Sequence, residues 1–267
     1  MSIFKLSFTG LFLFLIFSSS MAQYTEPMPI TGHKWLKEFI KIHLDYPEKA
    51  LLEKTQGTVK IKFTTDKNGE IIDHKIIQSI SFELDSAAQS IFNLVLWNPA
   101  TSQGNNVKGE AEFALKYNIK SFQKLAKKRG YKHIIPPYVP VDTSLIIYQL
   151  KQLDTIPKII PETGLKTISE LIYSKLSYPE VASKLGLTGK VELKFIIETN
   201  GLPSNITIQK HLGGGCTEEA IRIIELISWN PGLKDGLAVR ACYKISIDFN
   251  KGENRDGYIP NQQGSGI

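Results

Sequence analysis

Residues 46–69 read YPEKALLEKTQGTVKIKFTTDKNG, and residues 178–201 read YPEVASKLGLTGKVELKFIIETNG. Both stretches begin with Tyr-Pro-Glu, carry a glycine before a segment of alternating residues, and end with Asn-Gly. Tyr178 lies 132 residues after Tyr46, and the same interval separates the Trp-Asn-Pro runs at 97–99 and 229–231. A repeat that keeps one register without a gap indicates an internal duplication, so we expect one folded unit to occur twice.

The alternation inside the repeat predicts strands. Apolar residues take every second position over 59–63 and 191–195, with charged residues between them, which is typical of a strand with one buried face. The Asn-Gly pairs favour tight hairpin turns, so return strands are expected near 71–78 and 203–210. Because Pro203 has no N–H to donate, we expect the second of these strands to lie at a sheet edge.

Apolar residues at helical spacing predict a helix before each hairpin and another after it. The final strands are expected at 107–117 and 239–249, where apolar residues again alternate with polar ones. The order helix, strand, strand, helix, strand predicts an α+β fold built from two copies of a two-layer module, each with a three-stranded antiparallel sheet. The last strand is expected beside the first, which leaves its other side at an edge of the sheet.

The segments around the two copies differ in character. Residues 1–22 have an early lysine, an apolar run and small residues near the end, which predicts a signal peptide cut before Gln23. An uncleaved anchor in the inner membrane is the alternative. We expect the first module over 34–118, a proline-punctuated connector over 119–165 with a short basic helix near 121–129 and a short strand near 145–150, and the second module over 166–250. The polar tail 251–267 is expected to be disordered.

This series of motifs, in order and twice over, resembles the TonB C-terminal domain. The motifs are Tyr-Pro-Glu, a glycine before an alternating strand, Asn-Gly, an alanine-bearing helix, Trp-x-Pro, and Gly-x-x-Val at the opening of the last strand. The run GGGCTEEA at 213–220 is similar to the versions found in the Bacteroidetes group. The resemblance covers about 34–118 and 166–250 and makes the chain a tandem member of this family.

The resemblance implies a periplasmic module that binds a protein or an extended peptide, such as a segment of an outer-membrane receptor. Such a peptide adds a strand beside the last strand of the module. The candidate edge residues are therefore Lys108, Glu110, Glu112, Lys116, Cys242, Lys244 and Ser246. Charges on an edge strand serve equally well to block unwanted pairing, so this alternative stays open. Tyr46, Pro47, Tyr178 and Pro179 could line a peptide groove, although a role in packing is favoured for both tyrosines.

Several functions remain as alternatives. A true energy transducer of outer-membrane transport needs a membrane anchor and a long spacer, and we expect neither before the first module. A structural scaffold that forms a homodimer through the strand edges is the second alternative. An enzyme is not expected, because no catalytic set is visible, and no cofactor is expected. No metal site is expected from the histidines, which lack metal-ligand spacing; they are His33, His43, His74, His133 and His211.

Charge and cysteine content add three expectations. The net charge of +6 is spread over many segments, so we expect no nucleic-acid partner. The basic cluster within 124–132 is expected to be a solvated helix face rather than a site for an anionic polymer. Cys216 falls on an apolar helix stripe and Cys242 on the opposite parity of the last strand, so we expect no bridge between them.

Overall fold

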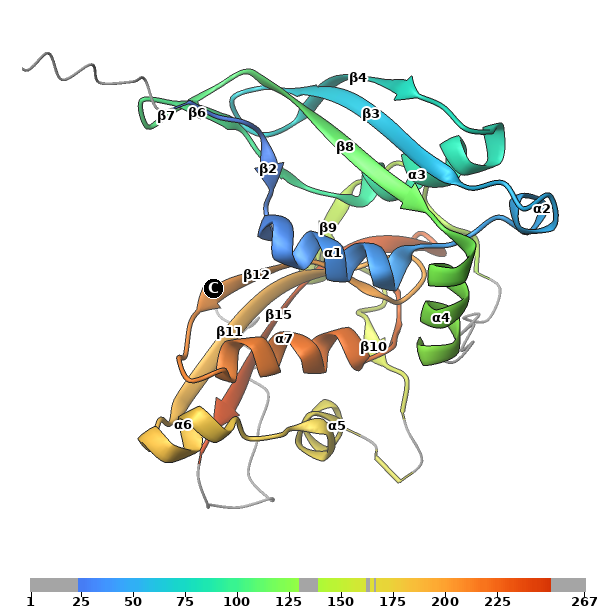
Figure 1. The fold of residues 1–267 in the computed structure, drawn as a ribbon. Coiled ribbons are helices and arrows are strands. Elements are labelled where there is room, and N and C mark those ends of the chain that lie inside the picture. The colour runs from blue at the N-terminus through green and yellow to red at the C-terminus, as the bar shows by residue number, and fades with distance from the viewer. Residues whose placement is uncertain (1–23, 130–138, 162–163, 166, 251–267) are drawn as a thin grey trace, which may run out of the picture.

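The computed structural model describes residues 24–129, 139–161, 164–165 and 167–250. The predicted signal peptide and the predicted disordered tail lie outside these residues. None of the helices in the described ranges is long and apolar enough to cross a membrane. The chain forms two similar α+β units, one above the other in Figure 1, which confirms the predicted fold class.

The first module follows the predicted order of elements. Its helices and strands are α1 (Gly32–His43), α2 (Glu48–Leu52), β3 (Gly57–Thr65), β4 (Ile71–Gln78), α3 (Phe82–Leu94) and β8 (Gly109–Tyr117). The sheet is antiparallel with the order β4-β3-β8, so the last strand lies beside the first, as predicted. The alternating apolar residues of β3 and β8 face α3 and form a buried core around Phe63, Phe92 and Phe113.

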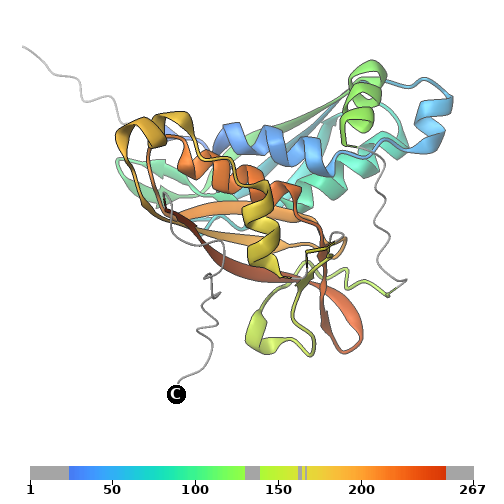
Figure 2. The same ribbon diagram turned by 90° about the horizontal axis from the view of Figure 1, so that it is seen from below.

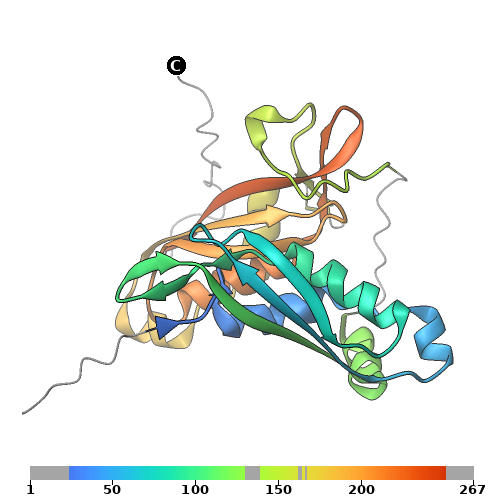
Figure 3. The ribbon, with the colours of Figure 1, turned by 90° about the horizontal axis from the view of Figure 1, so that it is seen from above.

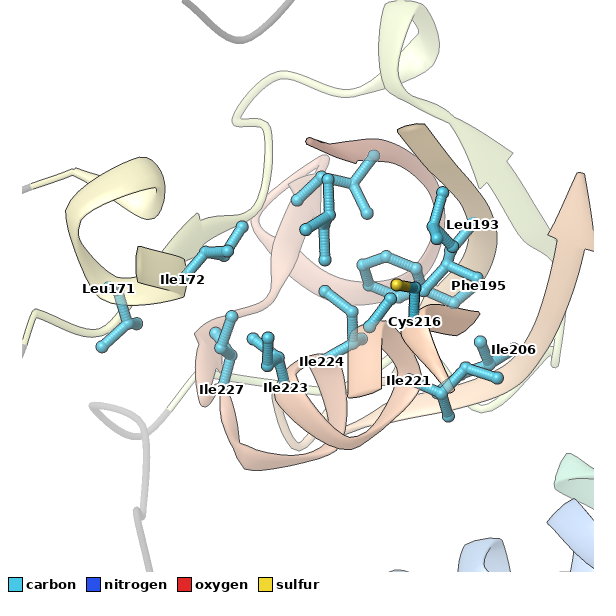
Figure 4. Close-up of a cluster of buried hydrophobic side chains, with 14 of the residues drawn as sticks. Leu171, Ile172, Leu193, Phe195, Ile206, Cys216, Ile221, Ile223, Ile224 and Ile227 are labelled. Carbon is cyan, nitrogen blue, oxygen red and sulfur yellow. The ribbon is translucent and has the colours of Figure 1, made fainter. Parts of the chain in front are cut away.

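The second module repeats this arrangement. Its elements are α5 (Ile168–Lys175), α6 (Glu180–Leu185), β11 (Gly189–Ile197), β12 (Pro203–Lys210), α7 (Cys216–Leu226) and β15 (Leu237–Phe249). Figure 4 shows isoleucines of α7 packed against Leu193 and Phe195 of β11. The strand that begins at Pro203 lies at an edge of the sheet, which confirms that prediction.

Each module also has a leading segment that the sequence did not reveal. In the first module this segment contains β1 (Tyr24–Thr25) and β2 (Met28–Pro29). Strand β2 pairs with β5 (Trp97–Asn98), and β1 pairs with β6 (Ala100–Ser102). Strand β6 also pairs with the strand that follows it, β7 (Asn105–Val107). In the second module β10 (Lys158–Ile159) pairs with β13 (Trp229–Asn230), and Thr155 bridges to Leu233 of β14 (Gly232–Lys234). The two leading segments therefore occupy the same place in the fold.

The connector is more ordered than its proline content indicates. It contains the basic helix α4 (Ile119–Arg129), the short strand β9 (Ile147–Gln149) and a 3-10 turn, η1 (Leu150–Gln152). The helix begins two residues before the predicted range of 121–129, and the strand lies inside the predicted range of 145–150. The strand β9 adds to the sheet of the second module and runs parallel to β15, a pairing that the sequence did not predict.

A buried polar cluster joins the two modules. Arg240 of β15 makes a bidentate ion pair with Glu198, with N–O distances of 2.8 and 3.0 Å, and the two side chains are 4% and 2% exposed. The same guanidinium donates to the carbonyl oxygen of Leu94, at the end of α3, and to that of Leu145 in the connector. Asn205 donates to Leu94 as well. We call Glu198, Asn205 and Arg240 the intermodule cluster.

Helix α1 lies between the modules (Figures 1 and 2). Its Trp35 packs against the core of the second module, and the Nε2 atom of His43 lies 3.0 Å from the carbonyl oxygen of Pro203. The two modules thus share buried apolar and polar contacts.

The carboxyl group of Glu225 is held at this interface and gives a pH-dependent prediction. Burial, and secondarily Glu38 of α1, raises its pKa from 4.5 to about 7, while Lys41 opposes the shift. The folded protein therefore holds a proton that the unfolded chain has already released, and the resulting stability is lost as the pH rises through 7. Because the carboxyl keeps contact with solvent, Glu225→Gln is expected to stabilise the protein by about 1–2 kcal/mol at pH 8.

Thermal unfolding of the wild type and of Glu225→Gln at pH 4.5 and at pH 8 measures this effect. The two proteins should differ little at the lower pH, where the wild-type carboxyl is protonated in the folded state and about half protonated in the unfolded chain. An equal difference in stability at both pH values would show that the stabilisation by Glu225→Gln does not depend on the protonation of Glu225.

Both cysteines are free and buried, which confirms that they form no bridge. In the part of the chain that the structure describes, no group of three metal-ligating side chains comes together.

Candidate functional site: an open strand edge and its groove

The outer edge of β8 is one of the two edges of the sheet in the first module, and it is the edge formed by the last strand. On its inner side β8 pairs with β3 along its whole length, from Gly109 opposite Thr65 to Tyr117 opposite Gly57. On its outer side it has no partner strand among the described residues. The strand follows the rim of the sheet in Figure 3. A row of backbone N–H and C=O groups is therefore free to pair with another chain.

The predicted edge residues of this module alternate as a strand requires. Lys108, Glu110, Glu112 and Lys116 are exposed on the face away from the helices. Glu110 forms an ion pair of 2.6 Å with Lys62 of β3, which lowers the pKa of its carboxyl through a hydrogen bond and through charge attraction. The charge of Glu110 is thus partly engaged within the sheet rather than directed along the edge.

A groove of about 460 Å³ lies directly under this edge. The leading segment, α1, the start of β5 and the middle of β8 form its walls; the lining residues are Thr25, Glu26, Pro27, Met28, Pro29, His33, Leu36, Trp97, Ala111, Glu112, Phe113 and Ala114. Most of these side chains are apolar, and Glu26, His33 and Glu112 add polar groups. The groove opens beside the backbone of residues 111–114, so an added strand would place its side chains there.

The indole of Trp97 forms part of the groove wall. This residue is 8% exposed, and its Nε1 atom has no hydrogen-bond partner among the described residues. The hairpin glycine fixes the position of this loop: Gly69 has a φ of +87°, and a Cβ atom there would lie 2.1 Å from the carbonyl oxygen of Trp97. Only a residue without a side chain permits this close approach.

Tyr46 and Tyr178, the tyrosines considered as groove residues, lie outside the groove. Tyr46 is 3% exposed, donates to the carbonyl oxygen of Thr55 and packs edge-on against Tyr117. Tyr178 donates to the carbonyl oxygen of Leu187 and packs edge-on against Phe249. Pro47 and Pro179 precede the short helices α2 and α6 as their N-terminal caps. None of the four residues lines the groove under β8.

The edge of the second module is partly occupied. Cys242 pairs with Ile196 on one side and with Gln149 of β9 on the other, so the expectation of a free edge does not hold at this residue. The connector lies at this edge because residues 147–149 run beside β15 before the chain enters the second module. Lys244 and Ser246 pair with β11 on one side, and no described strand lies on their other side.

The groove residues of the leading segment were missed because they fall outside the 132-residue register. Thr25 and Pro27 match Thr155 and Pro157, but at an interval of 130 residues. A search for Thr-x-Pro before each first helix, with a two-residue shift allowed, is a signal that could have found them.

An open edge strand above an apolar groove is an architecture for interaction with another polypeptide in extended form. The family model described as the Gram-negative bacterial TonB protein C-terminal matches this chain twice, over residues 42–119 and 174–250. The chain therefore belongs to the TonB C-terminal family and contains two of its domains. Domains of this family work in the periplasm, in interactions between proteins of the cell envelope.

One solved structure is similar, the NMR solution structure of the TonB C-terminal domain of Helicobacter pylori (residues 179–285). It is 24% identical, and the match covers 32% of this chain and 77% of that domain with a TM-score of 0.25. No curated protein matches the chain.

Proposed function

We propose that this protein is a periplasmic adaptor that binds an extended segment of another envelope protein by adding it as a fourth strand to β8. The observation that carries the proposal is the coincidence of the unpaired edge of β8 with the groove beneath residues 111–114. The opposite edge strand of the sheet, β4, has no buried side chain, and none of its residues lines this groove.

The backbone of β8 would supply most of the hydrogen bonds. In the second module both the N–H and the C=O of Ala238 face outward, toward Pro140 and Asp142. Backbone groups alternate sides along a strand, so the equivalent outward groups of the first module belong to the even-numbered residues Glu110, Glu112, Ala114 and Lys116. Each such bond contributes about 1 kcal/mol net, so the edge alone gives weak and unselective binding.

The groove would supply the selectivity. Every second side chain of an added strand points toward the helix layer, where Met28, Leu36 and Trp97 form apolar walls. These positions of the partner are expected to be apolar, and burying one such side chain contributes about 1.5–3 kcal/mol. The intervening side chains would lie on the outer face beside Glu112 and Lys116, where polar residues fit. The partner is therefore expected to be a short segment with alternating apolar and polar residues.

Photo-crosslinking in cells tests the proposal. A photoreactive residue at Ala114, on the open edge, should capture an envelope protein through an extended segment, whereas the same residue at Ile77, on the opposite edge strand β4, should not. A synthetic peptide of the captured segment should then bind the purified protein. Adducts formed only between two copies of the chain would favour the homodimer scaffold instead, and equal capture from both positions would contradict a site at β8.

A transducer anchored in the inner membrane would use the same edge. That alternative depends on residues 1–22, and N-terminal sequencing of the mature protein together with membrane fractionation separates it from the adaptor. The adaptor predicts an N-terminus at Gln23 and release from the membrane.

A further inference from the structure

The connector covers the outer edge of β15 at its beginning. The N–H of Asp142 donates to Ala238, and the N–H of Ala238 donates to Pro140, at 2.9 and 2.8 Å. Further along, Ile147 lies opposite Arg240 and Gln149 opposite Cys242. The segment 140–149 thus pairs with β15 at two places, at 140–142 and at 147–149, and residues 143–146 form a loop between them.

Among the described residues, the first module has no such occupant at the equivalent position. Glu110 is the counterpart of Cys242 at the interval of 132 residues, and it pairs with Thr64 on its inner side. In the described ranges no residue pairs with Glu110 on the outer side. Within the described residues, the two copies of one fold therefore differ in whether the edge at the start of their last strand is occupied.

The groove is also open in the first module and filled at the equivalent position of the second. Ala111, which lines the groove of the first module, corresponds to Tyr243 in the second. The ring of Tyr243 lies 4.9 Å from that of Trp229 and 5.6 Å from that of Phe195, and burial raises the pKa of its phenol. Trp229 is the counterpart of the groove residue Trp97. An aromatic ring thus takes the space that remains open beside Trp97.

The second module also supports the groove of the first. The side chain of Asn205 accepts a hydrogen bond from the N–H of Leu96 and donates one to the carbonyl oxygen of Leu94. These residues immediately precede Trp97. Trp35 of α1 packs against the second core, while His33 and Leu36 of the same helix line the groove. Two walls of the groove are therefore held from the side of the second module.

We propose that the connector segment 140–149 is an intramolecular ligand that closes the start of the β15 edge, from Ala238 to Cys242, so that β8 is the last strand whose outer edge is open along its whole length among the described residues, with the second module as its support. The proposal rests on the proposed function for the role of β8. The closure itself is independent of it, because it concerns only contacts within the chain.

Amide hydrogen exchange on the full mature chain tests the closure without a partner. Backbone groups alternate sides along a strand, so the N–H of Cys242, four residues after Ala238, points outward toward β9. Its exchange should therefore be at least about 100-fold slower than that of the N–H of Glu110, its counterpart on β8. Equal exchange at Cys242 and Glu110 would overturn the proposal.

A substitution in β9 shows whether the connector segment is a detachable ligand or an integral part of the second module's fold. Tyr148 lies opposite Ala241, so in a parallel ladder its N–H and C=O bond to the residues on either side, Arg240 and Cys242. Tyr148→Pro removes the N–H that donates to the carbonyl oxygen of Arg240 and should detach β9 from β15, so that the Cys242 amide, which donates to the carbonyl oxygen of residue 148, exchanges as fast as that of Glu110. The amides of Ile245 and Ile247, which face β11, should keep their protection.

If protection at Ile245 and Ile247 falls together with that at Cys242, the segment is part of the fold rather than a ligand, and the proposal is wrong. Unchanged protection at Cys242 would also overturn it, since the segment would not be what covers the edge. None of these readouts requires a partner, so a failure of β8 to bind one would leave them unaffected.

Discussion

Arg240→Met is expected to lower the free energy of unfolding by about 3–5 kcal/mol, because it leaves the carboxylate of Glu198 buried without its charge partner. Glu198 is 2% exposed, so water cannot replace the guanidinium. The substitution also removes the donors to Leu94 and Leu145, which join the first module and the connector to β15. The loss should therefore appear as separation of the modules as well as reduced stability.

Urea unfolding measures this loss, and the duplication supplies a matched control. Lys108 stands at the equivalent position of the first module but is exposed, so Lys108→Met should change stability by less than about 0.5 kcal/mol. Combining Arg240→Met with Glu198→Gln removes the uncompensated charge and should recover part of the loss. A cost below about 1 kcal/mol for Arg240→Met alone would contradict the role of the intermodule cluster.

Ala111→Tyr is expected to weaken partner binding by at least about 100-fold, since the new ring would fill the groove under β8 as Tyr243 fills its counterpart. The fold already holds a tyrosine at this position in the second module, packed on Trp229 and Phe195. Their counterparts Trp97 and Phe63 are present in the first module, with ring centroids 4.3 Å apart. We therefore expect the variant to fold.

The reciprocal variant is the control. Tyr243→Ala opens space in the second module, where β9 still covers part of the edge, so binding should stay within about twofold while stability falls by about 2–4 kcal/mol. Titration with the peptide captured from position 114 gives the affinities, and thermal unfolding verifies the fold of each variant. Full binding by a folded Ala111→Tyr protein would show that partner side chains do not enter the groove.

The repeated elements could be predicted because their signals are local. Alternation at 59–63, the hairpin at Asn68-Gly69 and the helix stripes depend on residues close together in the chain, and each is present twice. The order of the sheet followed from connecting these elements, and the open edge of β8 followed from that order.

The contacts between the modules could not be predicted in this way. Arg240 and Asn205 belong to strands whose elements were anticipated, but the sequence does not say what covers them. Both are buried because the end of α3 and the connector lie over that part of the sheet. Cys242 was taken for an edge residue for the same reason, since strand alternation indicates a face but not its neighbours.

The groove was hidden by a change of register. The leading segments are two residues closer together than the modules they precede, so the 132-residue interval does not align them. Met28 and His33 belong to no repeated motif, and they become groove residues only when β2 pairs with β5 and places them beside β8.

Amide exchange along β8 in the presence of the captured peptide tests the central claim most directly. If the peptide adds a strand at this edge, the outward amides of Glu110, Glu112 and Ala114 become protected on binding, while those of Lys244 and Ser246 on β15 do not change. Protection that falls on β15 or on β4 while the β8 amides continue to exchange freely would contradict the claim that β8 is the acceptor.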